Sequence, residues 1–218
     1  EAPEPTVNYL YLAGQSALGR FANREAIRFY GRALKVGEEH HDVRVEARVA
    51  EMEEGLLHAY HGAGDMDGSL AHGLDALDVL GRPAARSNVG LVFGLLGQVL
   101  VGFLQGRWPG LFKTRGDADV DNRLAAARIE NRISEIAVFR EENLRCLYSA
   151  LRQLNIAHPC GPTAELGRAY AVMAIILGTV PMRRVADAWS NRAVQTADQL
   201  EAQLDRAWIY TRCGSYET

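Results

Sequence analysis

Helical periodicity runs through almost every long segment of this chain and is interrupted by regularly placed turn signals. In the stretch from 164 to 177, Leu166, Tyr170 and Met173 fall on one helical face. Glycine and proline break the pattern near 37, 62–65, 81–83, 106–110, 159–162 and 178–181. No segment shows the alternation typical of a β-strand. The chain is therefore predicted to be all-α, built as tandem antiparallel helix hairpins.

The second helices of these hairpins resemble one another. Each carries a small residue followed seven positions later by an alanine. The pairs are Ala26 and Ala33, Ser69 and Ala76, and Ala186 and Ala193. Ala33 and Ala76 are 43 positions apart, as are Ala150 and Ala193. Small residues suit helices that cross closely, and a repeat of this length indicates a solenoid.

The turn signals divide the chain into repeat units within a single helical-repeat domain spanning 1–218. The expected units are 6–37, 43–81, an irregular 84–118, 119–158, 163–200, and an incomplete or capping helix at 201–218. The Pro-rich, acidic start has no basic or apolar region of a signal peptide and is typical of a linker. We expect the chain to be a fragment of a longer protein that continues past Thr218, or else to end on a capping helix with Trp208 largely buried against Trp189 or its neighbours.

Two segments resemble tetratricopeptide repeats. In the segment from Leu10 to Val36, Gly14 stands where the first helix packs closely, and Ala26, Tyr30 and Ala33 match the second helix. The segment from Glu53 to Pro83 matches through Tyr60, the turn at Gly64-Asp65, and Pro83. The early tryptophan of the repeat is absent, and the spacing exceeds the usual ~34 residues. The resemblance implies a right-handed superhelical solenoid whose first helices line a concave groove.

The chain as a whole resembles the divergent tetratricopeptide-like region that follows the ATPase module of bacterial signalling (STAND-type) ATPases. Some of those proteins carry a class III adenylate or guanylate cyclase domain. The similar elements are Phe21–Ile27, Leu80–Pro83, Gly106–Pro109 and Ala169–Ala171. The chain has neither a P-loop nor a cyclase motif, so such activity would belong to a neighbouring domain.

A concave groove of this kind would bind an extended protein segment through mixed polar clamps. The candidate groove residues are Asn8, Tyr11, Gln15 and Leu18, then Glu51, Glu54, His58 and His61, then Arg128, Arg132 and Glu135, and finally Arg168 and Ile175. The alternative interpretation is a solvated helix face without a partner.

Glu54, His58 and His61 also form the only weak metal candidate, because their spacing places them on one helical face. His40, His41 and Asp42 precede them and are possible additional ligands. A solvated polar face explains the same pattern, so we expect neither a metal nor another cofactor.

The run from Val89 to Leu104 is almost wholly apolar and rich in glycine. A helix that is apolar on all sides is expected to be buried, so the favoured interpretation is a buried central helix. The alternatives are a helix that docks a partner or domain and, last, a membrane-associated helix, which would need ~20 apolar residues.

Charge and cysteine content restrict the setting. The net charge is -3, unlike the basic footprint of a nucleic-acid binder. The three cysteines are widely spaced and form no CxxC pair, as expected in a reducing, cytoplasmic compartment.

The leading functional hypothesis is a protein-interaction or regulatory scaffold module, not an enzyme. Its partner would be a protein segment or its own upstream ATPase domain. No nucleic acid is expected, and membrane contact is not favoured, with Val89–Leu104 as its only candidate. One alternative is an architectural or dimerising spacer, and a minor one is a metal-dependent site at His58 and His61. No complete catalytic set is present, and the partner and the oligomeric state are left open.

Overall fold

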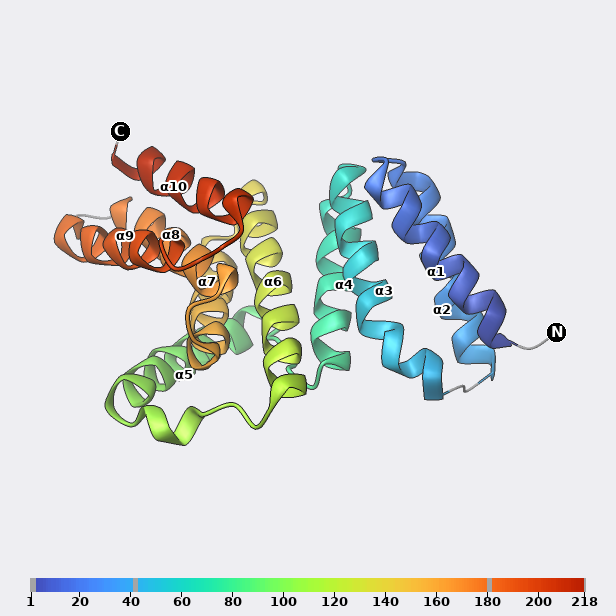
Figure 1. The fold of residues 1–218 in the computed structure, drawn as a ribbon, viewed down its shortest axis with the longest axis horizontal. Helices are drawn as coiled ribbons and strands as arrows, with labels where there is room; N and C mark the ends of the chain where they lie inside the picture. The colour runs from blue at the N-terminus through green and yellow to red at the C-terminus, as the bar shows by residue number, and fades with distance from the viewer. Residues whose placement is uncertain (1–2, 41–42, 180–181, 218) are drawn as a thin grey trace. The chain divides into compact units, whose positions relative to one another are not determined.

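The computed structural model describes residues 3–40, 43–179 and 182–217, with side chains over 6–39, 48–179 and 182–214. Regular structure in these ranges is entirely helical, which confirms the all-α prediction. The helices form two compact units, Glu1–Arg86 (unit 1) and Ser87–Thr218 (unit 2) (Figure 1).

Unit 1 consists of two antiparallel helix hairpins. Its helices are α1 (Pro3–Gly19), α2 (Asn23–His40), α3 (Val43–Gly62) and α4 (Met66–Val79). α1 pairs with α2 and α3 with α4, and α2 also packs along α3. These hairpins occupy the first two expected repeat units.

Three hairpin turns in the chain are closed by the same hydrogen bond. In each turn a backbone N–H beyond the first helix donates to a carbonyl five residues earlier. The bonds are Ala22 to Ala17, Asp65 to Tyr60 and Glu142 to Ala137, each 2.9 Å from N to O. The residue before each donor has a left-handed backbone: Phe21 (φ 59), Gly64 (φ 83) and Glu141 (φ 58). This geometry is that of a Schellman turn. The hairpins therefore share a backbone conformation at the turn as well as a sequence pattern.

The centre of unit 1 is organised by one tyrosine held between two glycines. Tyr30 of α2 is 2% exposed. A Cβ added to Gly14 of α1 would lie 2.7 Å from one edge of its ring, and a Cβ added to Gly55 of α3 would lie 2.6 Å from the other. The small residues expected at the helix crossings, among them Ala26 and Ala33, are fully buried. Small residues therefore let three helices close around one large ring.

Gly55→Ala should destabilise unit 1, because the new methyl group would overlap the Tyr30 ring. Overpacking of this kind costs about 1–3 kcal/mol, which exceeds the gain in helix propensity. Gly31→Ala on α2 is the matched control, since an added Cβ there meets nothing within 4 Å. It should raise stability by about 0.5–1 kcal/mol. Urea unfolding followed by circular dichroism measures both, and equal shifts would contradict the packing argument.

Unit 2 contains six α-helices and two short 3-10 turns among the described residues. They are α5 (Asn88–Arg107), η1 (Pro109–Phe112), α6 (Asp117–Phe139), α7 (Asn143–Ala157), η2 (His158–Cys160), α8 (Ala164–Gly178), α9 (Arg183–Ala197) and α10 (Gln203–Glu217). α6 pairs with α7 and α8 with α9, while α5 packs on α7. Leu166, Tyr170 and Met173 are buried on one face of α8, as their spacing predicts.

The prediction of a buried central helix at Val89–Leu104 is wrong within this chain. Only 11% of the apolar window of α5 is buried. α5 is also the one described helix long and apolar enough to cross a membrane, a test that core helices of soluble proteins also pass. Its contact side uses Leu91 and Gln105, which are 2% and 5% exposed, and leaves the opposite side uncovered. α5 remains largely exposed because one helix, α7, packs along it and covers one of its sides.

The last helix packs on the preceding hairpin, but not through the tryptophan that the sequence suggested. α10 contacts α8 and α9 through buried Ile209 and Cys213. Trp208 is half-buried and lies between the guanidinium groups of Arg168 and Arg212, at 5.4 and 5.1 Å. Trp208 is thus partly buried, and the most buried contacts of α10 come from Ile209 and Cys213. Ile209 takes the inward position because it fits against Gly167 of α8.

A buried ion pair joins α6 to α7 in the core of unit 2. Arg152 Nε lies 3.0 Å from Glu130 Oε1, and the two side chains are 7% and 0% exposed. Arg152 also donates to the Tyr148 hydroxyl at 3.1 Å. Burial raises the pKa of Glu130 above its ordinary 4.5, although Arg152, Ser149 and Arg145 oppose the shift.

The stability of unit 2 should therefore carry a pH dependence that comes from Glu130. With its pKa raised in the folded state, Glu130 contributes stability that is fully present below the unfolded pKa and is lost as pH rises through the folded pKa. The melting temperature of the native chain minus that of Glu130→Gln should fall as pH increases above about 4.5, because only the native chain loses this contribution. Thermal scans across this range measure it. If this difference is constant or rises with pH, burial is not the dominant influence on the pKa of Glu130.

Candidate functional site

The structure gathers four of the predicted groove residues of unit 1 into one polar cluster. The Tyr11 hydroxyl donates to Glu51 Oε2 at 2.6 Å, and Gln15 Nε2 donates to the Tyr11 oxygen at 2.6 Å. Asn8 Oδ1 accepts from Arg48 at 2.5 Å, and the Arg48 guanidinium lies 5.3 Å from the Tyr11 ring centroid. The cluster links the first helices of the two hairpins.

Arg48 is the member of this cluster that sequence reasoning missed. It lies one turn before Glu51 on α3, so the register that selected Glu51 could have found it. Burial, with the hydrogen bond to Glu51, raises the pKa of Tyr11 to about 12. Tyr11 is therefore a neutral hydrogen-bonding group at physiological pH, and the cluster holds α1 against α3.

The remaining unit 1 candidates do not converge on a metal site. Glu54, His58 and His61 are half-buried on α3, and each already takes part in a polar or ring contact within the chain. Among the described residues, their ligand atoms do not form a group close enough to share an ion. His41 and Asp42, and the side chain of His40, lie outside the described residues.

A different trio on the same hairpin does bring potential ligands together. The ligand atoms of Glu53, His72 and Asp75 lie within 4.8 Å of one another. His72 Nδ1 is 2.6 Å from Glu53 Oε2, and its ring stacks on Tyr60 with centroids 5.0 Å apart. Asp75 pairs with Arg86 at 2.7 Å. These contacts account for the trio as links within the hairpin, so no metal is assigned to it.

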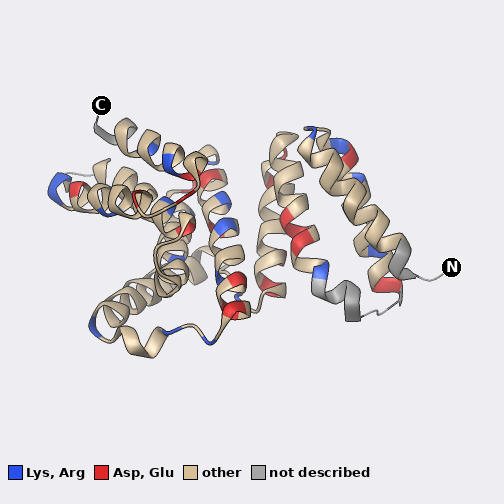
Figure 2. Ribbon diagram, in the orientation of Figure 1, with Lys and Arg blue, Asp and Glu red and all other residues tan. Residues whose placement is uncertain are grey.

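The predicted groove residues of unit 2 are engaged in ion pairs along α6, α8 and α10. Arg128 reaches Glu165 at 3.3 Å, and Arg168 reaches Asp205 at 2.6 Å, so each pair links two successive first helices. Arg132 pairs with Glu135 within α6 at 2.6 Å. Charged side chains thus tie neighbouring first helices together. In Figure 2 acidic and basic residues are mixed along α6.

A small hollow of about 160 Å³ lies beside these ion pairs. Glu135 and Ile175, both predicted, line it together with Val172, Ile176 and Trp208. Cys146 contributes its thiol, whose pKa burial raises above the ordinary value. The thiol is therefore protonated and a poor nucleophile at neutral pH.

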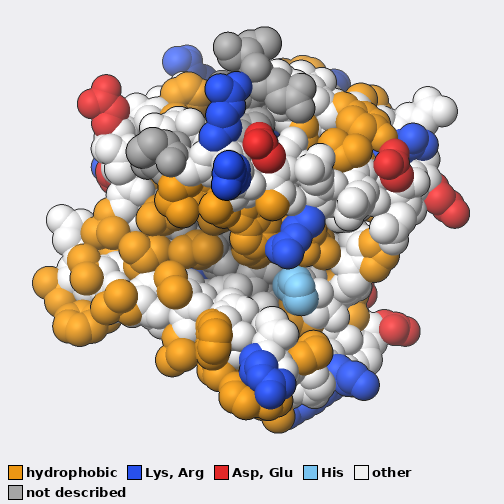
Figure 3. All heavy atoms as spheres, turned by 90° about the vertical axis from the view of Figure 1, so that its left-hand side faces the viewer, with side chains coloured by type: hydrophobic (Ala, Val, Ile, Leu, Met, Phe, Trp, Pro, Cys, Tyr) orange, Lys and Arg blue, Asp and Glu red, His pale blue; other side chains and the backbone are white. Residues whose placement is uncertain are grey.

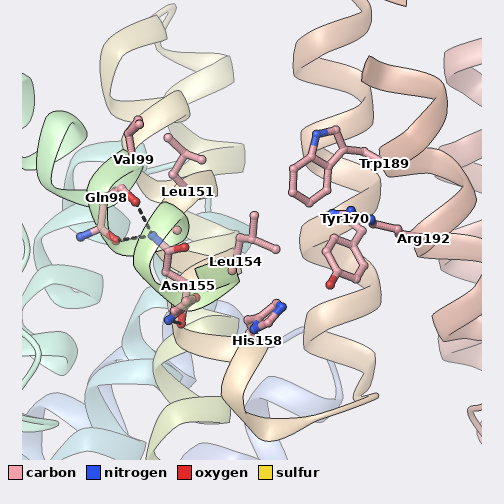
Figure 4. A pocket seen from close by; sticks show the side chains of 12 residues that line it. Gln98, Val99, Leu151, Leu154, Asn155, His158, Tyr170, Trp189 and Arg192 are labelled. Carbon is pink, nitrogen blue, oxygen red and sulfur yellow. Dashed lines mark hydrogen bonds between the residues drawn. The ribbon is translucent and has the colours of Figure 1, made fainter. Parts of the chain in front are cut away.

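A larger groove, of about 300 Å³, opens on the other side of unit 2, between α5 and α7 on one wall and α8 and α9 on the other. Its lining residues are Gln98, Val99, Gly102, Gln105, Gly106, Leu151, Leu154, Asn155, His158, Tyr170, Trp189 and Arg192. Figure 4 shows side chains of the two walls facing each other, with His158 at one end. In Figure 3 hydrophobic side chains surround a hollow on unit 2, with a histidine beside it.

One wall of this groove is fixed by an amide network. Asn155 Nδ2 donates to the Gln98 carbonyl at 2.8 Å and to Gln98 Oε1 at 2.9 Å (Figure 4). Gln105 Nε2 donates to the Asn155 carbonyl at 2.8 Å. Asn155 and Gln105 are both 5% exposed. Buried amides with satisfied hydrogen bonds hold α5 in one register on α7.

The other wall presents two aromatic rings and an arginine. Tyr170 and Trp189 lie with ring centroids 5.5 Å apart and planes tilted by 39°. The Arg192 guanidinium lies 5.0 Å from the Trp189 centroid. Tyr170 is buried, whereas Trp189 is half-buried and Arg192 is exposed. Tryptophan, tyrosine and arginine are the residues that most often dominate binding energy at protein interfaces.

The titratable groups of the groove suit binding better than catalysis. Burial lowers the pKa of His158, and the nearby Arg192 charge lowers it further. Burial raises the pKa of Tyr170, although Arg192 opposes this. At neutral pH the groove therefore offers a neutral imidazole, a neutral phenol and one cation. Among the described residues that line the groove, no nucleophile is paired with a base.

Sequence reasoning missed this groove because it assigned binding to first helices. The groove instead uses the second helices, α7 and α9, together with the irregular α5 and one residue of a first helix, Tyr170 of α8. The available signal was Trp189, which lies one helical turn before Arg192 on α9. Its place on a periodic apolar face favoured a core position, and only packing shows that part of the ring is exposed.

Comparisons of this chain with protein-family models, with curated proteins and with solved structures find no match. The assignment of function therefore depends on the grooves and surfaces themselves.

The pKa of His158 provides a test of the groove geometry. Arg192→Gln should raise this pKa, because a neighbouring positive charge is removed, but should leave it below 6.5, since burial is the larger cause. NMR titration of the imidazole in both proteins measures the change. An unchanged pKa would mean that Arg192 does not approach His158 in solution.

Proposed function

We propose that this chain is a protein-interaction module and that unit 2 binds a protein segment in the groove between α5/α7 and α8/α9. The observation that carries the proposal is the half-buried Trp189, flanked by Tyr170 and Arg192 at the edge of that groove.

The groove favours an apolar anchor beside an acidic group on the partner. Leu151, Leu154 and Trp189 form apolar surface that a bulky side chain would cover. Arg192 is exposed above the Trp189 ring and would attract a carboxylate. Asn155 and Gln98 already bond to each other, so the wall is preformed and ordering it on binding costs little.

The resemblance to tetratricopeptide-like regions of signalling ATPases supports a regulatory role and a cytoplasmic setting. In this proposal the partner segment belongs to an ATPase or cyclase domain of the same polypeptide, or to a separate protein. The first helices of successive hairpins lie next to one another within unit 2, which is consistent with a tetratricopeptide-like stack.

The groove can be tested with a photo-crosslinking amino acid in place of His158, which is exposed at its end, in cells that make the protein. The expected result is a crosslink to a defined protein segment, identified by mass spectrometry. The same label in place of Leu204, which is 88% exposed on α10, is the control and should not capture that segment.

Trp189→Ala should weaken binding of the captured segment by roughly thirtyfold, the effect expected when an aromatic hot spot is truncated. Arg192→Ala, at an exposed position, provides a second variant that leaves the core intact. Titration calorimetry with the segment measures both. Crosslinks confined to a second copy of the chain would support the architectural alternative, and unchanged affinity in both variants would rule out the groove.

A further inference from the structure

The outward side of α5 forms a continuous apolar stripe. Its members, called the α5 stripe, are Val89 (67% exposed), Val92 (47%), Phe93 (71%), Leu96 (63%), Val99 (57%), Leu100 (56%) and Phe103 (67%). They recur at spacings of three and four residues, so they share one face of the helix. Exposed apolar patches of this extent mark a surface that contacts another apolar phase.

The apolar surface continues past the end of the helix. Trp108 is 47% exposed at the C-cap of α5, and Leu111 is 77% exposed in η1. The Arg107 guanidinium lies 5.3 Å from the Trp108 ring centroid. An apolar helix that ends in tryptophan and arginine is typical of segments at a membrane–water interface.

The charged residues of the segment that carries the stripe are all basic, up to the acidic run that begins at Asp117. Residues 79–116 contain no aspartate or glutamate, although the chain has 27 acidic residues and a net charge of -3. Arg107, Lys113 and Arg115 are exposed at the C-terminal end of the stripe. In Figure 2, α5 carries no charged residue along its length except at this end. The segment therefore complements a negatively charged surface.

The inward side of α5 excludes a transmembrane orientation while the helix stays packed. Gly94 lies against the Tyr148 ring, where an added Cβ would be 2.6 Å from Cε2. Gln98 and Gln105 hydrogen-bond to Asn155 of α7. α7 also holds the buried Arg145 and Arg152, which would be costly to place in hydrocarbon. Only the outward half of the helix is available to lipid.

We propose that the α5 stripe, with Trp108 and Leu111, binds the surface of a membrane that contains anionic lipids. The helix lies in the plane of the interface, its apolar side chains enter the boundary between headgroups and acyl chains, and the basic end contacts lipid phosphates. A second copy of the chain is the less favoured occupant, because the basic end would find no acidic group on another α5 segment. The stripe meets the proposed groove at Val99, which belongs to both, whereas Phe93, Leu96 and Phe103 do not line the groove.

Sedimentation with lipid vesicles tests the proposal on the whole chain. The protein should sediment with vesicles of phosphatidylcholine and phosphatidylglycerol, and much less with phosphatidylcholine alone. Replacement of Phe93, Leu96 and Phe103 by glutamine should lower the partition coefficient by roughly a hundredfold. The matched control replaces Phe21, Phe139 and Leu204, which are 87%, 70% and 88% exposed elsewhere, and should leave binding unchanged.

The charge contribution needs a second pair of variants. Replacement of Arg107, Lys113 and Arg115 by glutamine should reduce binding to the anionic vesicles by at least roughly tenfold. Replacement of Arg24, Arg32 and Lys35, all exposed on α2, is the control and should have little effect. Circular dichroism of each variant verifies the helical fold.

Two results would overturn the proposal. One is a failure of the native chain to bind either kind of vesicle. The other is a dimer in sedimentation equilibrium that the α5 stripe variant converts to monomer, without any vesicle binding by the native chain. The latter result would assign the stripe to a second copy. Loss of segment binding in Trp189→Ala tests the proposed groove and does not affect the test of membrane binding.

Discussion

Close contact between glycine and a large side chain is the constraint on which both units depend. In unit 1 the Tyr30 ring fills the space that Gly14 and Gly55 leave on the two neighbouring helices. In unit 2 Tyr148 occupies the corresponding space at Gly94. Each contact lets a tyrosine ring lie closer to the neighbouring helix backbone than a residue with a Cβ would allow, and the surrounding alanines are fully buried.

The glycine contact in unit 2 also explains why α5 has two unlike sides. Tyr148 against Gly94 and the amides of Gln98 and Gln105 determine which side of α5 meets α7. Since the other positions from Val89 to Gly106 are all apolar or glycine, whichever side faced outward would be hydrophobic. A fully apolar helix packed on a single neighbour thus produces an exposed apolar surface, and the same packing forms one wall of the groove beside Trp189.

The polar side chains of the first helices connect one hairpin to the next. Ion pairs and hydrogen bonds on the first helices, such as Tyr11 with Glu51 and Arg168 with Asp205, join successive hairpins. Asn8, Tyr11, Gln15 and Glu51 of the predicted groove set lie in one cluster of unit 1, and their role in binding a partner stays a prediction. The sequence could not show that many of these groups bond to one another, because partners 37 or 40 residues apart depend on how the hairpins stack.

The sequence by itself determined the all-helical class, the positions of the hairpins and the small residues at their crossings. These properties follow from local periodicity and turn residues, whose effects act over a few positions of the chain. Only the tertiary structure decided that α5 is exposed, that Trp208 stacks between arginines, and that Trp189 borders a groove. Burial is a property of what lies across from a side chain, and an apolar pattern is the same whether its facing partner is a neighbouring helix, another molecule or water.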